Sequence, residues 1–134
     1  MIFSPWFIFC IIPEWIKRTD LDYLRAKGFI GLISEEEALA LIKEGSSTAG
    51  GPKPGKETLG SRWIIERANA YGLEKKKDPL WLLVWGSMTD VAQAFHDDPS
   101  IADKVRIYYI GSNNTKADVE SRDYIFHGMK DKWP

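Results

Sequence analysis

The fold is decided by residues 79–95, which read PLWLLVWGSMTDVAQAF. The first seven residues form a continuous apolar run, which is typical of a strand buried on both faces. Gly86 and Ser87 then form a turn. The apolar residues that follow are spaced i, i+3, i+4 and i+7, and they are Met88, Val91, Ala92 and Phe95. This spacing predicts an amphipathic helix, so the stretch predicts an α/β fold with a parallel sheet and helices on each side, a three-layer αβα arrangement.

A second strand follows at the spacing of a strand–helix–strand unit. Asp98 and Pro99 suit the N-cap and the first helical residue of a short turn that ends near Asp103. Residues 105–110, VRIYYI, then predict the second strand. Two parallel strands joined by a helix in this way form a right-handed βαβ unit.

The carboxyl ends of the two predicted strands are where a ligand is expected. Open α/β sheets bind ligands in loops beyond these ends, here residues 85–87 and 111–115. The second of these loops is polar and lies within the segment 111–116. A further helix is expected at residues 118–129, after that loop.

Two helices and a long loop are expected before the first strand. Ser34 and Glu37 have the spacing of a capping box, which predicts a helix from there to about Glu44 with Gly45 as its stop. Residues 45–57 are rich in Gly and Pro and predict a flexible loop. A second helix is expected from Thr58 to about Ala70, ended by Gly72. Its inward stripe would be Leu59, Trp63, Ile64, Ala68 and Tyr71.

Length and charge exclude several classes of protein. A chain of 134 residues is about one domain's worth, so residues 1–134 are expected to form a single domain. Lys and Arg number 18 against 19 Asp and Glu, so no basic field is available to attract nucleic acid. The lone Cys10 cannot form an internal disulfide and is expected to pack as a small apolar residue. Lys75–Lys77 form the one basic cluster and suit a solvated loop.

The apolar N-terminal stretch 1–12 is too short to cross a membrane. About 20 apolar residues are needed for a spanning helix. The stretch also lacks a basic region and an A-x-A cleavage site, so a secretory signal has only weak support, and the compartment stays open. A buried strand ended by Pro13 and a segment foreign to the fold are the other two interpretations.

The sequence resembles the nucleoside hydrolases between about Gly60 and Ile110. Residues 84–95, VWGSMTDVAQAF, resemble that family's G-P-L-T-N segment and the helix after it. Residues 96–105, HDDPSIADKV, resemble its D-P-E-L-A step into the next strand. GSRWII at residues 60–65 and DPLW at 78–81 are closer to one branch, the nucleoside-hydrolase-like domain of bacterial carbohydrate-associated proteins labelled cellulose-binding. The resemblance implies a Rossmann-like nucleoside hydrolase fold.

That resemblance also implies a chemistry. Family members hydrolyse the N-glycosidic bond of a nucleoside, with Ca²⁺ held by an N-terminal D-x-D-x-x-x-D-D cluster that binds the ribose hydroxyls and the attacking water. One further ligand is the backbone carbonyl that precedes the glycine of G-P-L-T-N, which is Trp85 in this chain. The acidic cluster is missing here, Ser87 replaces the proline, and Asp90 replaces the asparagine. The chain therefore resembles an incomplete, central part of the domain, and we expect it to bind no Ca²⁺ alone.

Candidate site residues each allow a second interpretation. Asn113 and Asn114 follow a strand end and could read substrate hydroxyls, but Asn also suits left-handed turns. Asp90 could face the substrate, or it could favour the helix dipole from the first turn. Trp85 could offer its carbonyl to a metal, or it could end a buried strand. No catalytic residue is assigned.

Two functions from different classes follow from these residues. The first is a fragment of an N-glycosyl hydrolase acting on a nucleoside or related sugar, inactive alone. The alternative is a non-catalytic carbohydrate-binding or interaction module on the same fold. Because the family domain is about twice as long, exposed sheet edges and self-association into homo-oligomers are also expected.

Overall fold

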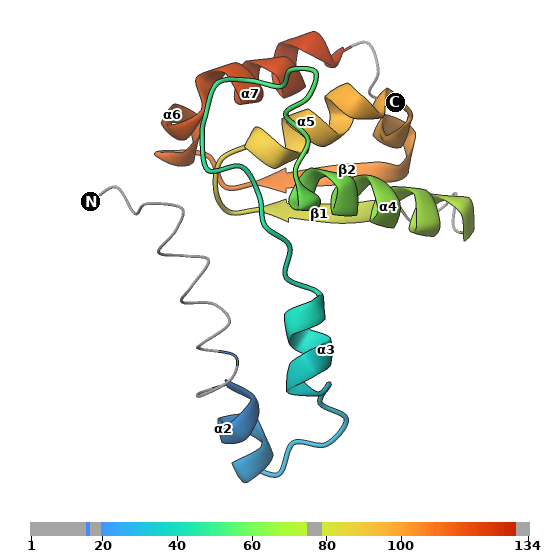
Figure 1. Ribbon diagram of the computed structural model, residues 1–134, viewed down its shortest axis with the longest axis vertical. Coiled ribbons are helices and arrows are strands. Elements are labelled where there is room, and N and C mark those ends of the chain that lie inside the picture. The colour runs from blue at the N-terminus through green and yellow to red at the C-terminus, as the bar shows by residue number, and fades with distance from the viewer. Residues whose placement is uncertain (1–15, 17–19, 75–78, 131–134) are drawn as a thin grey trace. The chain divides into compact units, whose positions relative to one another are not determined.

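The chain divides into two compact units, Met1–Ser47 and Thr48–Pro134. The computed structural model describes residue 16, residues 20–74 and residues 79–130 (Figure 1). The apolar stretch 1–12 with Cys10 and the basic run Lys75–Lys77 lie outside the described residues. Within the described ranges, no helix combines the length and the apolar character that a membrane span requires.

A strand–helix–strand unit forms the centre of the second unit, as the sequence predicts. Strand β1 (Leu80–Val84) pairs in parallel with β2 (Val105–Tyr109), in a register that runs from Leu80 opposite Val105 to Val84 opposite Tyr109. The connection contains helix α5 (Thr89–Asp97) and the 3₁₀ helix η2 (Pro99–Lys104). Asp98 caps η2 by accepting a hydrogen bond from the Ser100 amide at 3.1 Å. The predicted cap and the α/β class are both confirmed.

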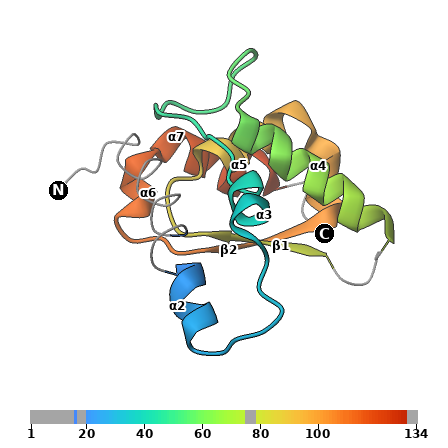
Figure 2. The same cartoon turned by 60° about the horizontal axis from the view of Figure 1, so that its bottom comes forward.

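The core of this unit forms around the inward face of α5. The four residues predicted to face inward, Met88, Val91, Ala92 and Phe95, are all buried. Helix α4 (Leu59–Glu74) packs against α5 and η2 and buries Ala68 in the same cluster. Figure 2 shows α4, α5 and the later helix α7 on one side of the two strands. The described residues of this unit thus supply the sheet and one helical layer.

Burial of β1 on both faces is a wrong prediction. Trp81 and Leu83 are 57% and 63% exposed, whereas Val84 is buried. The register places Tyr108 of β2, also exposed, opposite Leu83 on the same face. The other face contacts the core through Leu82 and Ile107. Because the helices of this unit pack on that face, the apolar run along β1 includes residues that face solvent.

Helix α4 also differs from its prediction. Leu59 and Tyr71 are predicted to face inward, but they are 57% and 50% exposed. The helix continues through Gly72 to Glu74 instead of ending at Ala70. A helical glycine costs about 1 kcal/mol relative to alanine. Packing of α4 along α5 and η2 offsets a cost of this size, so glycine alone does not end the helix.

The segment after β2 is more helical and more broken than predicted. Helix α6 (Asn114–Ala117) occupies part of the predicted polar loop. The predicted helix 118–129 consists of α7 (Val119–Asp123) followed by the π-helical turn η3 (Tyr124–Gly128). Asp118 separates α6 from α7 because its backbone is non-helical, with φ −149° and ψ 89°, and its side chain caps α7.

The first unit contains helices α2 (Leu21–Ala26) and α3 (Glu35–Ala40). The capping box at the start of α3 is confirmed, since Ser34 and Glu37 exchange both hydrogen bonds. The helix ends at Ala40 rather than at Glu44, because the next amides, Leu41 and Ile42, bond only three residues back. Asp20 occupies the N-cap of α2 and makes no side-chain cap hydrogen bond there.

Replacing Phe95 tests where the core lies. Phe95 is fully buried, so Phe95→Ala is expected to lower the free energy of unfolding by about 3–5 kcal/mol. Phe126 is 53% exposed, so Phe126→Ala is the matched control with a much smaller loss. Urea denaturation of the full chain measures both. Equal losses would show that α5 does not organise the core.

Candidate functional site

The carboxyl ends of β1 and β2 are held together by one side chain. Asn114 lies at the start of α6, and its Nδ2 donates to the Ile110 carbonyl at 2.8 Å. The same nitrogen lies 3.3 Å from the Trp85 carbonyl and donates to it as well. Asn114 therefore joins the two loops that the sequence predicts as ligand-binding.

Asn113 lies beside this bridge and is oriented differently. It is exposed, occupies the N-cap of α6 and makes no side-chain cap hydrogen bond. The interpretation of either Asn as a left-handed turn residue is wrong, because Asn113 has φ −63° and Asn114 is helical. The left-handed position is Ser112, with φ 60°. A non-glycine residue in this region is uncommon, and such residues concentrate at functional sites.

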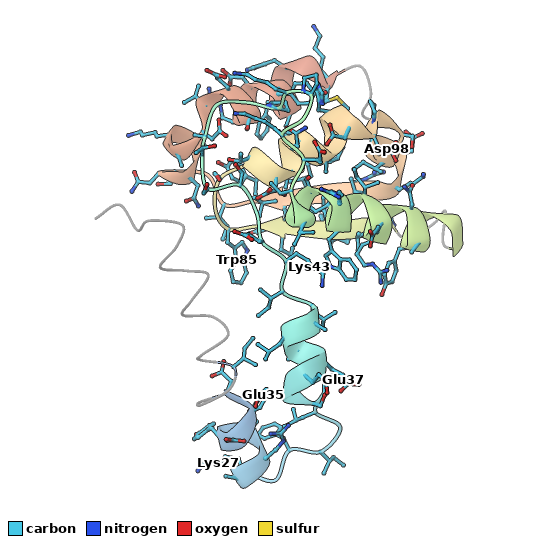
Figure 3. All side chains as sticks on the ribbon, viewed as in Figure 1. Lys27, Glu35, Glu37, Lys43, Trp85 and Asp98 are labelled. Atoms are coloured by element: carbon cyan, nitrogen blue, oxygen red, sulfur yellow. The ribbon has the colours of Figure 1, made fainter. Side chains whose placement is uncertain are left out.

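Trp85 presents its indole to solvent at the same end of the sheet. Its side chain is 70% exposed, and Figure 3 shows it projecting from the sheet on the side away from α5. The exposed indole supplies an apolar surface at this end of the sheet, and the exposed Asn113 on the neighbouring loop supplies hydrogen-bonding groups.

A buried carboxylate lies behind the site and was missed as a site residue from the sequence. Asp118 is 3% exposed and accepts hydrogen bonds from the Thr89 hydroxyl at 2.7 Å and the Ser121 hydroxyl at 2.7 Å. Thr89 shares a further hydrogen bond with Ser87 in the turn after β1, at 3.0 Å. Asp118 thus connects the β1 turn to α7. The signal in the sequence was the D-x-x-S spacing at the start of a predicted helix.

The hydrogen bonds around Asp118 also set its charge state. Burial raises the pKa of its carboxyl, but the bonds from Ser121, Thr89 and the Gly50 amide together outweigh burial, so the pKa is lowered. The carboxylate is therefore charged at neutral pH.

Asp90 is positioned by a different contact. It lies in the first turn of α5, as predicted, and its Oδ1 accepts a hydrogen bond from the Thr58 hydroxyl at 2.6 Å. Thr58 precedes α4 and exchanges hydrogen bonds with Ser61, each at 2.9 Å. The structure therefore ties Asp90 to the start of α4, and its contact with substrate stays a prediction.

The Gly/Pro-rich loop is also attached to the helices at Lys53 and Gly51, in addition to the bond from Gly50 to Asp118. The buried Gln93 of α5 exchanges hydrogen bonds with the backbone of Lys53, at 3.1 Å and 3.0 Å. Gly51 has φ +67°, and a Cβ built there would lie 3.0 Å from Glu120 Oε2. A side chain at Gly51 would be strained by this positive φ and would require Glu120 to shift by a few tenths of an ångström, so glycine lets the loop pass directly against α7.

The donor set around Trp85 does not fit the calcium ion that the resemblance implies. Calcium takes six to eight oxygen ligands. Among residues 16, 20–74 and 79–130, no group of three or more His, Cys, Asp or Glu side chains is placed to hold a metal ion. The Trp85 carbonyl already accepts a hydrogen bond from Asn114.

A family model covers most of the chain. The nucleoside hydrolase-like domain described as cellulose-binding Sde182 matches residues 19–133. The chain belongs to this family. No curated protein and no solved structure matches it. The match includes both strands, α5 and the strand-end site, and it confirms the family suggested by residues 60–65 and 78–105.

Acid titration tests the Asp118 network. A carboxyl whose folded pKa is lowered stabilises the fold above its unfolded pKa of about 3.9. This stabilisation is lost as pH falls through the lower folded pKa. Asp118→Asn is therefore expected to reduce the free energy of unfolding at pH 7 and to flatten its decline below about pH 4.

Urea denaturation over a pH series measures this effect. The control is Asp103→Asn, because Asp103 is an exposed carboxylate of the same type in η2. If Asp118→Asn and Asp103→Asn gave the same pH profile, the network would contribute nothing to stability.

Proposed function

We propose that this chain binds a sugar-like ligand at the carboxyl end of its sheet and does not itself cleave a glycosidic bond. Trp85, Asn113 and Asn114 carry the binding. The observation that supports this most directly is the exposed Trp85 indole, whose own backbone carbonyl is bridged by Asn114 to the end of β2.

The chemistry of a sugar suits this arrangement. A sugar ring presents C–H groups on its faces and hydroxyls around its edge. The Trp85 indole can stack on the C–H face of the ring. The Asn113 carboxamide can both donate hydrogen bonds to the sugar hydroxyls and accept hydrogen bonds from them. Asn114 acts mainly by position, because its Nδ2 is occupied by two backbone carbonyls. The description of the family as cellulose-binding supports a sugar as the ligand class.

Hydrolysis of an N-glycosidic bond is the second candidate. It is favoured by the family's likeness to nucleoside hydrolases and by the position of the Trp85 carbonyl at a strand end. The discriminating measurement is release of free base from a purine ribonucleoside by the full chain. Turnover would favour the hydrolase, and binding without turnover would favour the module proposed here.

Removing the indole tests the binding site. Trp85→Ala is expected to weaken binding of cellotetraose or of a ribonucleoside about tenfold, which is about 1.4 kcal/mol. Isothermal titration calorimetry on the full chain measures both ligands. Asn113→Ala is expected to weaken binding by a smaller factor, because it removes hydrogen bonds and leaves the stacking surface.

The matched control is Trp81→Ala, which removes an exposed indole from β1, the strand that Trp85 follows. Its affinity is expected to equal that of the unmodified chain. If Trp81→Ala lost as much affinity as Trp85→Ala, the result would indicate that the ligand contacts the whole exposed face of the sheet. If Trp85→Ala left the affinity unchanged, the strand end would be excluded as the binding site.

Metal addition gives an independent test. A ligand that binds only the folded state raises the melting temperature by an amount that grows with the logarithm of the ratio of ligand concentration to Kd. Neither millimolar Ca²⁺ nor a chelator is expected to change the melting temperature of the full chain. A rise with Ca²⁺ that the chelator reverses would contradict the proposal and favour the metal-dependent hydrolase.

A further inference from the structure

A separate pocket lies beside β2 and η3. It has a volume of about 390 Å³, which is within the range of about 300–1,000 Å³ that small-molecule sites occupy. Its lining includes Met88 and Ile125, both buried, and the partly exposed Ile107 and Phe126. None of Trp85, Asn113 and Asn114 lines it. This pocket is therefore distinct from the strand-end site.

One residue of the lining carries a polar atom without a partner. Tyr109 lines the pocket, and its hydroxyl is buried and makes no hydrogen bond. The Tyr109 ring packs near Phe126, with ring centres 6.3 Å apart. Burial raises the pKa of this hydroxyl, although the nearby Arg122 charge opposes the shift, so the group stays protonated at neutral pH. A buried hydroxyl needs an acceptor, and a ligand oxygen in the pocket would supply one.

The charged residues of the lining are both cations. Arg106 and Lys130 line the pocket, and no carboxylate among the described residues 20–74 and 79–130 does. Arg106 donates to the Val105 carbonyl at 2.9 Å, which leaves its charge uncompensated. Within the part of the chain that the structure describes, neither cation forms a salt bridge. An apolar cavity with two uncompensated cations favours an anionic guest.

We propose that this pocket binds a small amphipathic anion, a molecule with an aromatic or alkyl body and one carboxylate. The body contacts Met88, Ile107 and Ile125. The carboxylate lies near Arg106 and Lys130 and accepts a hydrogen bond from Tyr109. A sugar does not suit this lining, because its hydroxyls would face apolar side chains.

The test compares two probes of the same shape. The full chain is titrated with 2-naphthoate and with the neutral 2-naphthalenemethanol, and binding is followed by amide chemical shifts in NMR. Naphthoate is expected to bind at least tenfold more tightly, with the largest shifts at Ile107, Tyr109 and Ile125. Equal affinity of the two probes, or shifts centred on Trp85, would overturn the proposal.

Three variants locate the anion. Lys130→Met is expected to weaken naphthoate several-fold and to leave the alcohol unchanged, whereas Lys116→Met, on exposed α6, changes neither. Tyr109→Phe is expected to weaken naphthoate without lowering the melting temperature, since the hydroxyl it removes has no partner. Equal effects of the two Lys variants, or unchanged affinity in Tyr109→Phe, would contradict the assignment. Sugar binding is expected to be unaffected in all three.

Discussion

The burial of one face of α5 is the constraint on which the rest of the second unit depends. Phe95 and Ala92 are fully buried, and β1, β2, α4 and η3 all contribute residues to the cluster around them. Apolar burial contributes about 25 cal/mol per Å², so the stabilisation from this cluster grows with the apolar area that α5 and its neighbours remove from water. The parallel pairing of β1 and β2 requires a crossover connection, and α5 with η2 forms that connection.

The sequence predicts this centre well because its signal is local. The spacing of Met88, Val91, Ala92 and Phe95 has one helical period, and each of these residues is buried. The signal of β1 is less specific, because a continuous apolar run does not say which faces are covered. The exposure of Trp81 and Leu83 depends on where the helices pack, which is a property of the tertiary structure.

The candidate site also combines features that the sequence predicts with features that depend on the tertiary structure. The topology alone places the ends of β1 and β2 together, so Trp85, Asn113 and Asn114 could be named from their positions in the sequence. The hydrogen bond from Asn114 to the Trp85 carbonyl could not be predicted in this way. It joins residues 29 positions apart and depends on the rotamer of the Asn114 side chain. Asp118 was recognisable as a helix start, but its contact with Thr89 requires that α5 and α7 lie side by side.

The exposure of Trp85 has a spectroscopic consequence. An indole that is 70% exposed in the folded chain has nearly the same solvent contact after unfolding. Its fluorescence is therefore a poor measure of whether the protein is folded. A ring that stacks on Trp85 removes that water, shifts the emission to shorter wavelength and shields the indole from soluble quenchers. Trp85 is thus a built-in optical probe of what occupies the end of the sheet.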